Sequence, residues 1–207
     1  CKEQLDAAQK KLFKPIFGCE MYVARRRMFD KDGKQDQGGY HLVVLAKNKK
    51  GYHNLIKLVS KAWTDGFYSR PRTDRVELEK YHEGLIVCSA CVAGEIPRKI
   101  IQGKFDEAEE AILWYKRVFG DDFYLELQRH EVKNPSQRAN REAFSMQETA
   151  NIKLIEYSQK FGVKLVCTND VHFVDEENAE AHDRLICLST GKDLDDPTRM
   201  LYSKQEW

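Results

Sequence analysis

The stretch Val163-Lys-Leu-Val-Cys-Thr-Asn-Asp-Val-His-Phe173 joins a strand-like segment to two potential metal ligands. Its first part, 163–167, is largely apolar and predicts a buried strand, and Asp170 and His172 follow directly. In an extended segment, side chains two positions apart point to the same side, so we expect these two side chains to converge. A carboxylate and an imidazole at a strand end are typical of a metal site, and we predict that both are catalytic metal ligands.

Four other potential donors stand beside predicted strands: Glu20, His41, Cys91 and His130. Glu20 lies within an apolar segment, where a buried carboxylate would need a partner or a metal ion. His41 begins its strand, but an antiparallel hairpin would bring it to the end of the sheet near Glu20. Cys91 taken alone is more readily a small buried thiol, and His130 is as readily an exposed loop histidine. The recurring pattern favours an enzyme core.

The order of predicted elements indicates an α/β fold with a largely parallel sheet. Strands are expected to end near residues 24, 46, 88, 127 and 167, with helices at 3–13, 49–63, 105–119, 144–161 and 176–189 and short helices before Tyr81 and from about Pro97. The polar loop 25–39, with Asp32-Gly33 in its middle, predicts a hairpin between the first two strands. The residues expected on the core face of helix 49–63 are Tyr52, Leu55, Ile56, Val59 and Trp63.

Composition excludes several classes of protein. A formal net charge of +1 over 207 residues is far from that of a dedicated nucleic-acid binder, so any DNA contact would be local. Candidates for such contacts are Arg25–Arg27, Arg70, Arg72 and Lys99, although the Arg25–Arg27 run is most simply a solvated loop. No apolar run approaches the length of a membrane span, and the charged start is unlike a signal peptide, so we expect no membrane association. Six cysteines lack the density of a small secreted scaffold, which favours a reducing cytoplasm. Cys88 and Cys91 form a lone CxxC without the second pair of a zinc knuckle.

The donor set defines the chemistry that we expect. A mixture of His, Asp and Glu suits Zn²⁺, Mn²⁺ or Fe²⁺ better than Ca²⁺. Two or three such ions can generate hydroxide and stabilise both oxygens of a phosphate displacement, which predicts phosphoester hydrolysis. The sequence has no P-loop, no nucleophile-elbow motif and no dinucleotide fingerprint.

A series of segments, in order, resembles the PHP (polymerase and histidinol phosphatase) domain of bacterial C-family replicative polymerases, the DNA polymerase III alpha subunits. The segments are Lys14-Pro-Ile-Phe-Gly-Cys-Glu20 to Ala24, His41 to Asn48, Gly51 to Ser60 with Lys61-Ala-Trp63, Gly84 to Cys91, Gly94-Glu-Ile-Pro-Arg98, Tyr124-Leu-Glu-Leu-Gln-Arg-His130, Thr168-Asn-Asp-Val-His172, and Ala181-His182 with Thr190-Gly-Lys192. The resemblance spans nearly the whole chain.

The resemblance implies a distorted (β/α)7 TIM-like barrel, incomplete at the N-terminus because the family's opening His-x-His motif is absent. It implies a PHP domain over residues 1–190, with 191–207 starting the connection to a polymerase core. Because both ends look cut, we expect a fragment of a longer chain. The family ligand positions correspond to Glu20, His41, Cys91, Asp170 and His172, with His130 in a family motif, and two or three Zn²⁺, Mn²⁺, Mg²⁺ or Fe²⁺ ions would bind there.

By the same resemblance, the complete protein is expected to be a DNA-directed DNA polymerase whose PHP domain acts as a metal-dependent 3′–5′ exonuclease, this fragment alone being inactive. Expected partners are primer-template DNA, the rest of the polymerase chain, a sliding clamp and a proofreading subunit. The alternative is a non-catalytic module that stabilises the polymerase or docks that subunit. A stand-alone phosphatase of the histidinol phosphate type fits the polymerase-like segments less well.

Overall fold

A computed structural model describes residues 14–131, 143–202 and 205–206, and within them the chain divides into two compact units. The first unit comprises residues up to 39 and 43–87, and the second comprises 40–42 and residues from 88 onward. The expected helix 3–13 and most of the expected loop 132–143 lie outside the described residues. The boundary between the units passes through two strands, β2 (Tyr40–Ala46) and β4 (Leu85–Cys88).

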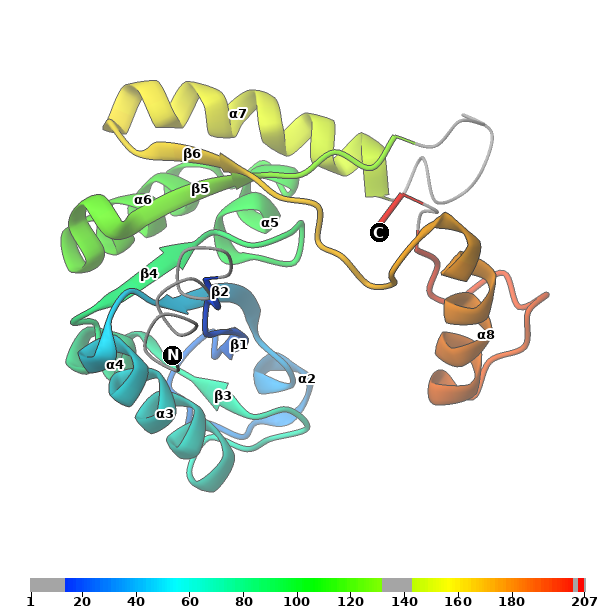
Figure 1. The fold of residues 1–207 in the computed structure, drawn as a ribbon, viewed down its shortest axis with the longest axis horizontal. Coiled ribbons are helices and arrows are strands. Elements are labelled where there is room, and N and C mark those ends of the chain that lie inside the picture. The colour runs from blue at the N-terminus through cyan, green and yellow to red at the C-terminus, as the bar shows by residue number, and fades with distance from the viewer. Residues whose placement is uncertain (1–13, 132–142, 203–204, 207) are drawn as a thin grey trace, which may run out of the picture. The chain divides into compact units, whose positions relative to one another are not determined.

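The first unit has strands in the order β3-β1-β2-β4 (Figure 1). Its elements are β1 (Gly18–Val23), α2 (Gly33–Asp36), most of β2, α3 (Lys49–Thr64), β3 (Arg72–Thr73), α4 (Arg75–Lys80) and most of β4. β1 pairs in parallel with β3. Gly18 at the start of β1 lies against Leu45 near the end of β2, and Gly39 lies against Val23. This arrangement confirms the antiparallel hairpin. The two-residue strand β3 and the short helix α2 were not expected.

Helix α3 turns a different face to the core from the one predicted. Its buried residues are Gly51, Asn54, Leu55, Leu58 and Ala62, whereas Tyr52, Ile56 and Trp63 are exposed. The helix starts where Asn48 caps the backbone N–H of Gly51. At Gly51 the helix backbone approaches the carbonyl of Gly84 so closely that no Cβ would fit. Because this backbone contact sets the rotation of the helix, the prediction from apolar spacing was right for Leu55 but wrong for Tyr52, Ile56 and Trp63.

A fully buried arginine crosslinks the loops of the first unit. The Arg72 guanidinium donates to the backbone carbonyls of Gly66, Asp36, Met28 and Asp30, at 2.7 to 3.1 Å. Burial lowers the pKa of Arg72 from its usual value. Its planar fork of donors suits several carbonyls at once, so one side chain holds together segments far apart in the sequence.

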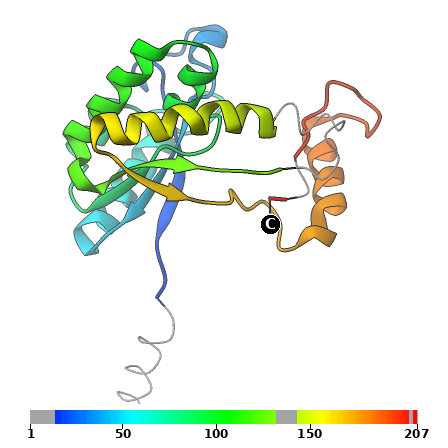
Figure 2. The same cartoon turned by 90° about the horizontal axis from the view of Figure 1, so that it is seen from above.

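The second unit packs helices against β5 (Phe123–Leu127) and β6 (Lys164–Cys167), which pair in parallel. Its helices are α5 (Glu95–Ile101), α6 (Phe105–Phe119), α7 (Ser145–Phe161) and α8 (Ala179–Thr190), with 3₁₀ turns η1 (Gly120–Asp122) and η3 (Glu176–Asn178). Figure 2 shows α7 lying along β5 and β6, whereas α8 follows beyond the end of β6. The α/β class and the parallel pairing are as predicted.

The core of the second unit follows the predicted face of α6. Ala108, Ile112, Tyr115 and Phe119 are all buried, and α6 packs against α5. The Tyr115 ring stacks on Phe123 of β5, with centroids 5.3 Å apart. Burying each such large side chain contributes roughly 1.5–3 kcal/mol. The helices therefore fix the strands whose ends carry the candidate ligands.

We predict that Asp74 makes the stability of the first unit depend on pH. Burial alone raises the pKa of Asp74, but hydrogen bonds from Arg27 and from the N–H groups of Glu77 and Met28 outweigh it, and the pKa is lowered. A carboxylate with a lowered folded pKa stabilises fully above its unfolded pKa of about 3.9 and loses that contribution as pH falls further. The free energy of unfolding should drop below about pH 4.

Denaturant unfolding between pH 2 and 7 measures this effect. Asp74→Asn should be less stable near neutral pH and should show a shallower acid decline than the wild type. Asp32→Asn, an exposed aspartate of the same unit, is the matched control and should keep the wild-type profile. Equal acid slopes in wild type and Asp74→Asn would contradict the prediction.

Candidate metal centre

The second unit brings together two of the predicted ligands, His41 and Cys91. His41 stands at the start of β2, where its N–H donates to the carbonyl of Ala93 at 3.2 Å. Cys91 follows the end of β4, after Ala90, whose positive φ of 61° turns the chain. The Cys91 Sγ lies 3.6 Å from the His41 Nδ1, and both residues are half-buried.

The spacing of this pair fits a shared metal ion. With typical Zn–S and Zn–N bond lengths and a tetrahedral angle, two such donors would lie about 3.6 Å apart. A thiolate and an imidazole are also ligands that Zn²⁺ and Fe²⁺ accept. The second unit therefore contains a His–Cys pair whose geometry is compatible with a shared metal ion.

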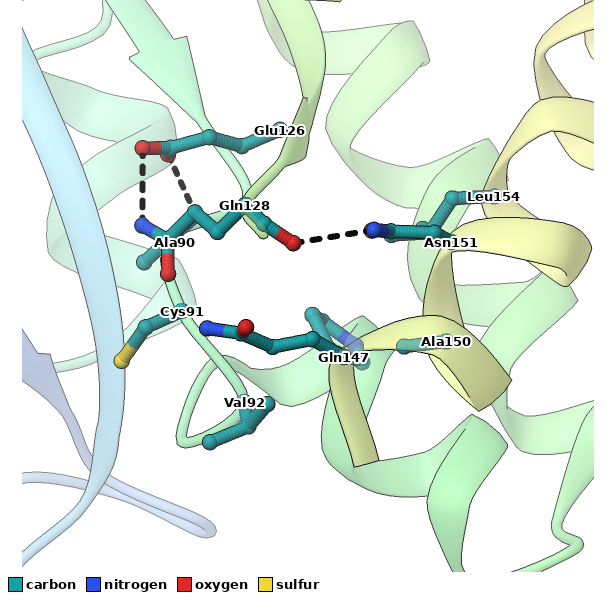
Figure 3. Close-up of a pocket in the computed structure, with 10 residues that line it drawn as sticks. Ala90, Cys91, Val92, Glu126, Gln128, Gln147, Ala150, Asn151 and Leu154 are labelled. Carbon is teal, nitrogen blue, oxygen red and sulfur yellow. Dashed lines mark hydrogen bonds between the residues drawn. The ribbon is translucent and has the colours of Figure 1, made fainter. Parts of the chain in front are cut away.

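A buried carboxylate, Glu126 of β5, holds the turn that carries Cys91. Glu126 is only 4% exposed, and its Oε2 accepts the N–H of Ala90 at 2.9 Å (Figure 3). Its Oε1 accepts from the Thr168 hydroxyl and from the Gln128 amide. The backbone N–H of Glu126 donates to the Ser89 hydroxyl at 2.8 Å. One residue thus ties the segments that follow β4 and β6 to β5.

The space around this carboxylate is nearly filled. Figure 3 shows Glu126, Gln128 and Asn151 joined to Ala90 by a chain of hydrogen bonds, with Cys91 at its margin. The cavity that these residues line, about 10 Å³, is barely large enough for one water molecule. Its lining is therefore a support for the Cys91 turn and not a substrate pocket.

The other cysteine of the CxxC is unsuited to redox or metal chemistry in this structure. Cys88 is buried, and burial, reinforced by the nearby Glu126 carboxylate, raises its pKa to about 12. With this raised pKa Cys88 stays protonated, and because the thiolate is the reactive and ligating form, it is only a core thiol. Cys88 and Cys91 are both free thiols.

Glu20 lies in β1 of the first unit, and its side chain is exposed. The argument that a buried Glu20 needs a partner was therefore wrong in its premise. β1 alternates, so Met21 and Val23 take the buried positions and leave Glu20 on the other side. Glu20 stays a proposed ligand, with its carboxylate on the exposed side of the strand.

Asp170 and His172 lie beyond the end of β6, but not in an extended segment. Asp170 has a positive φ of 48°, so the alternation of side chains that we expected does not continue through it. His172 turns its Nδ1 to the backbone carbonyl of Asp170, at 2.6 Å. Among the described residues, neither is grouped with His41 and Cys91 as donors to one ion.

His130 is buried, and both of its ring nitrogens have partners. Its Nε2 lies 2.7 Å from the carbonyl of Asn169, and its Nδ1 lies 2.7 Å from the Gln147 amide nitrogen. The Gln147 carbonyl also accepts the backbone N–H of His130. The expected alternative of an exposed loop histidine was wrong. Direct ligation by His130 would require one of these two bonds to break.

Two carboxylates of this region were missed from the sequence, Glu126 and Glu206. Glu206 is buried and faces the rings of His130 and His172. For Glu126 a signal existed, since a charged residue interrupts the apolar strand 123–127. Glu206 follows no strand or motif, and its position emerges only when the chain returns to the Asp170 loop.

Two of the basic residues considered as DNA contacts are structural. Arg72 is fully buried, and Lys99 is 9% exposed and paired with Glu95 at 2.8 Å. Neither can reach a phosphate without unfolding its surroundings, so these two residues are no longer candidates for DNA contact. Arg26 and Arg27 pair with Asp36 and Asp74, which agrees with the simpler interpretation of the Arg25–Arg27 run as part of a loop.

Comparison with known proteins places this α/β chain with its His–Cys pair in a family. Residues 1–130, more than half of the chain, match the PHP domain. The chain therefore belongs to the PHP domain family, whose fold is of the TIM-barrel type. No helix in the described part of the chain is long and apolar enough to cross a membrane.

Three relatives similar to this chain all carry the name DNA polymerase III subunit alpha. The chain is 46% identical over 203 residues to the DNA polymerase III subunit alpha of Borreliella burgdorferi, covering 97% of the chain and 16% of that protein. It is 40% identical to that of Thermus aquaticus and 39% identical to that of Treponema pallidum, with 94% of the chain covered in each comparison. The chain thus spans 15–16% of the length of these relatives.

We predict that removing the Glu126 carboxylate destabilises the second unit. Glu126→Ala leaves the Ala90 N–H and the Thr168 hydroxyl without their buried acceptor, at a cost of about 2–4 kcal/mol in unfolding free energy. Chemical denaturation measures the loss. Glu131→Ala, which removes an exposed carboxylate, should stay within about 0.5 kcal/mol of wild type. A loss for Glu126→Ala no larger than that of this control would contradict the prediction.

Proposed function

We propose that the chain is the PHP portion of a bacterial replicative DNA polymerase III alpha subunit, and that in the complete protein this portion is a metal-dependent 3′–5′ exonuclease. Residues 1–190 would form the domain and 191–207 the start of the connection to the polymerase core. The observation that carries the proposal is the His41–Cys91 pair, 3.6 Å apart, in a chain of the PHP family.

The proposed ligands are Glu20, His41, Cys91, His130, Asp170 and His172, for two or three divalent ions of zinc, manganese, magnesium or iron. Ions held there would activate water and stabilise charge on the phosphate. His41 and Cys91 would hold one ion through Nδ1 and Sγ. His172 would bind through Nε2, because its Nδ1 is engaged by the Asp170 carbonyl. Glu20 and His130 enter the set through the resemblance.

The name of the relatives supports a proposal for the cellular compartment, the reaction and the partners of the complete protein. We propose that the complete protein works in the cytoplasm as a DNA-directed DNA polymerase on primer-template DNA. Its partners would be the remainder of its own chain, a sliding clamp and a proofreading subunit. These assignments are supported by 46%, 40% and 39% identity to proteins named DNA polymerase III subunit alpha.

The non-catalytic docking module is the second candidate. It is favoured by the bonding of His130, whose two ring nitrogens are both occupied by protein partners. A histidine of a family motif whose two ring nitrogens bond to protein groups is what a domain retained for stability would contain.

Metal binding by the His41–Cys91 pair is the first test. In the intact parent polymerase, Cys91→Ser replaces a soft sulfur by a hydroxyl and should weaken Zn²⁺ binding at this position at least about tenfold. Mutation of a residue that only hydrogen-bonds to a ligand already lowers metal affinity by that factor, and loss of the ligand itself should cost no less. Competition with a chromophoric chelator measures the affinity. Cys167→Ser, which changes an exposed thiol outside the proposed set, should leave affinity unchanged. Equal affinities in all three proteins would remove Cys91 from the ligand set.

Digestion of a mismatched primer end separates the two candidate functions. With the intact parent polymerase purified with its metals, Asp170→Asn should abolish 3′–5′ digestion while polymerisation continues, because a carboxylate ligand is lost. Asp175→Asn, an exposed aspartate a few residues further on, is the matched control and should digest normally. Absence of digestion in the wild type would favour the docking module, and undiminished digestion by Asp170→Asn would place the activity elsewhere.

A further inference from the structure

The end of the chain returns to the loop that carries Asp170 and His172. The backbone carbonyl of Glu206 accepts the N–H groups of His172, at 2.8 Å, and of Phe173, at 3.4 Å. The carbonyl of Gln205 accepts from the Asn169 amide at 3.2 Å. Residues 205–206 therefore bind the Asn169 side chain on one side of Asp170 and the backbone of His172 and Phe173 on the other, although they are more than thirty positions away in the sequence.

The side chain of Glu206 faces two imidazole rings. Its Oε2 lies 3.4 Å from the Nδ1 of His172, and its Oε1 lies 3.9 Å from the Nδ1 of His130. Glu206 is only 5% exposed. A buried carboxylate is costly unless it is paired, so its place between two imidazoles indicates a defined role.

The same nitrogen of His172 also faces a carbonyl. With the Nδ1 2.6 Å from the Asp170 carbonyl oxygen, the ring proton belongs on Nδ1, since a carbonyl can only accept. The lone pair is then on Nε2, the nitrogen proposed above to ligate. The Glu206 carboxylate lies beside that Nδ1–H and adds negative charge there. Carboxylates that face the outer nitrogen of a ligating histidine fix its tautomer and raise its basicity.

The rest of the returning segment packs around the same ring. Tyr202 lies with its ring centroid 4.4 Å from that of His172, and His182 of α8 lies 5.8 Å away. Arg199 pairs with Asp183, which ties the segment to α8. Burial and the neighbouring His172 lower the pKa of His182, so His182 is favoured as a neutral packing partner.

We infer that Glu206 is a positioning residue for His172: its carboxylate orients the ring and holds the proton on Nδ1, so that Nε2 is presented to a metal ion. The inference rests on the proposed function, because it presupposes that His172 is a ligand. It assigns part of the metal site to a segment outside the ligand motifs, in the stretch proposed to begin the connection to the polymerase core.

The test measures metal binding by the intact parent polymerase after its metals have been removed. Glu206→Gln keeps the backbone bonds to His172 and Phe173 and removes only the negative charge. It should lower the affinity for Zn²⁺ or Co²⁺ at the His172 position by about 10–100-fold. It should also change the visible absorption of bound Co²⁺, which a purely structural role would not alter. Glu206→Asp should recover part of the affinity, and Glu180→Gln on α8 is the exposed control.

The outcomes separate the two proposals. If His172→Ala removes one bound ion but Glu206→Gln binds as tightly as wild type with an unchanged Co²⁺ spectrum, the positioning role is wrong and the proposed function stands. If His172→Ala changes neither the number of ions nor their affinity, His172 is not a ligand, and both the proposed function at this position and the role of Glu206 are wrong. A selective loss in Glu206→Gln supports the inference.

Discussion

The buried carboxylate of Glu126 is the constraint on which the arrangement of the second unit depends. It stands in β5 and accepts hydrogen bonds from the Ala90 N–H, which follows β4, and from the Thr168 hydroxyl, which follows β6. Desolvating a carboxylate is expensive, so the fold is stable only when these donors converge on it. That convergence places Cys91 directly after one tied residue and Asp170 shortly after another.

Backbone strain marks the same two places. Among the described residues other than glycine, positive φ occurs at Ser69, Ala90 and Asp170. Ala90 immediately precedes the proposed ligand Cys91, and Asp170 is itself a proposed ligand. Left-handed backbone at such residues costs of order 1–3 kcal/mol and persists only where the surroundings hold it. Here the Glu126 carboxylate holds Ala90, and the bonds from residues 205–206 hold the Asp170 loop.

The two groups of donors differ in how they are supported. His41 and Cys91 approach each other because a strand start and a strand end meet, as the bond from the His41 N–H to the Ala93 carbonyl shows. His130 and His172 are instead embedded in hydrogen bonds with Gln147, Asn169 and Glu206. A site of the first kind needs little beyond the sheet itself. The second kind depends on segments that follow the last described strand, such as residues 205–206. A change in the position of these segments would therefore move the histidine rings.

The sequence by itself determined the longer helices and strands, the hairpin and the family. Apolar periodicity and the glycine or aspartate residues between segments located β2, α6 and β5, because both are local properties of the sequence. Ordered motifs pointed to the PHP family, and they named His41 and Cys91. Only the tertiary structure decided which face of α3 is buried, since the contact of Gly51 with Gly84 is a backbone contact between distant residues. It also decided that Glu20 is exposed, that Arg72 is a core crosslink, and that Glu206 reaches His172. Each of these depends on which segments meet in three dimensions, and a pattern read along one segment does not contain that information.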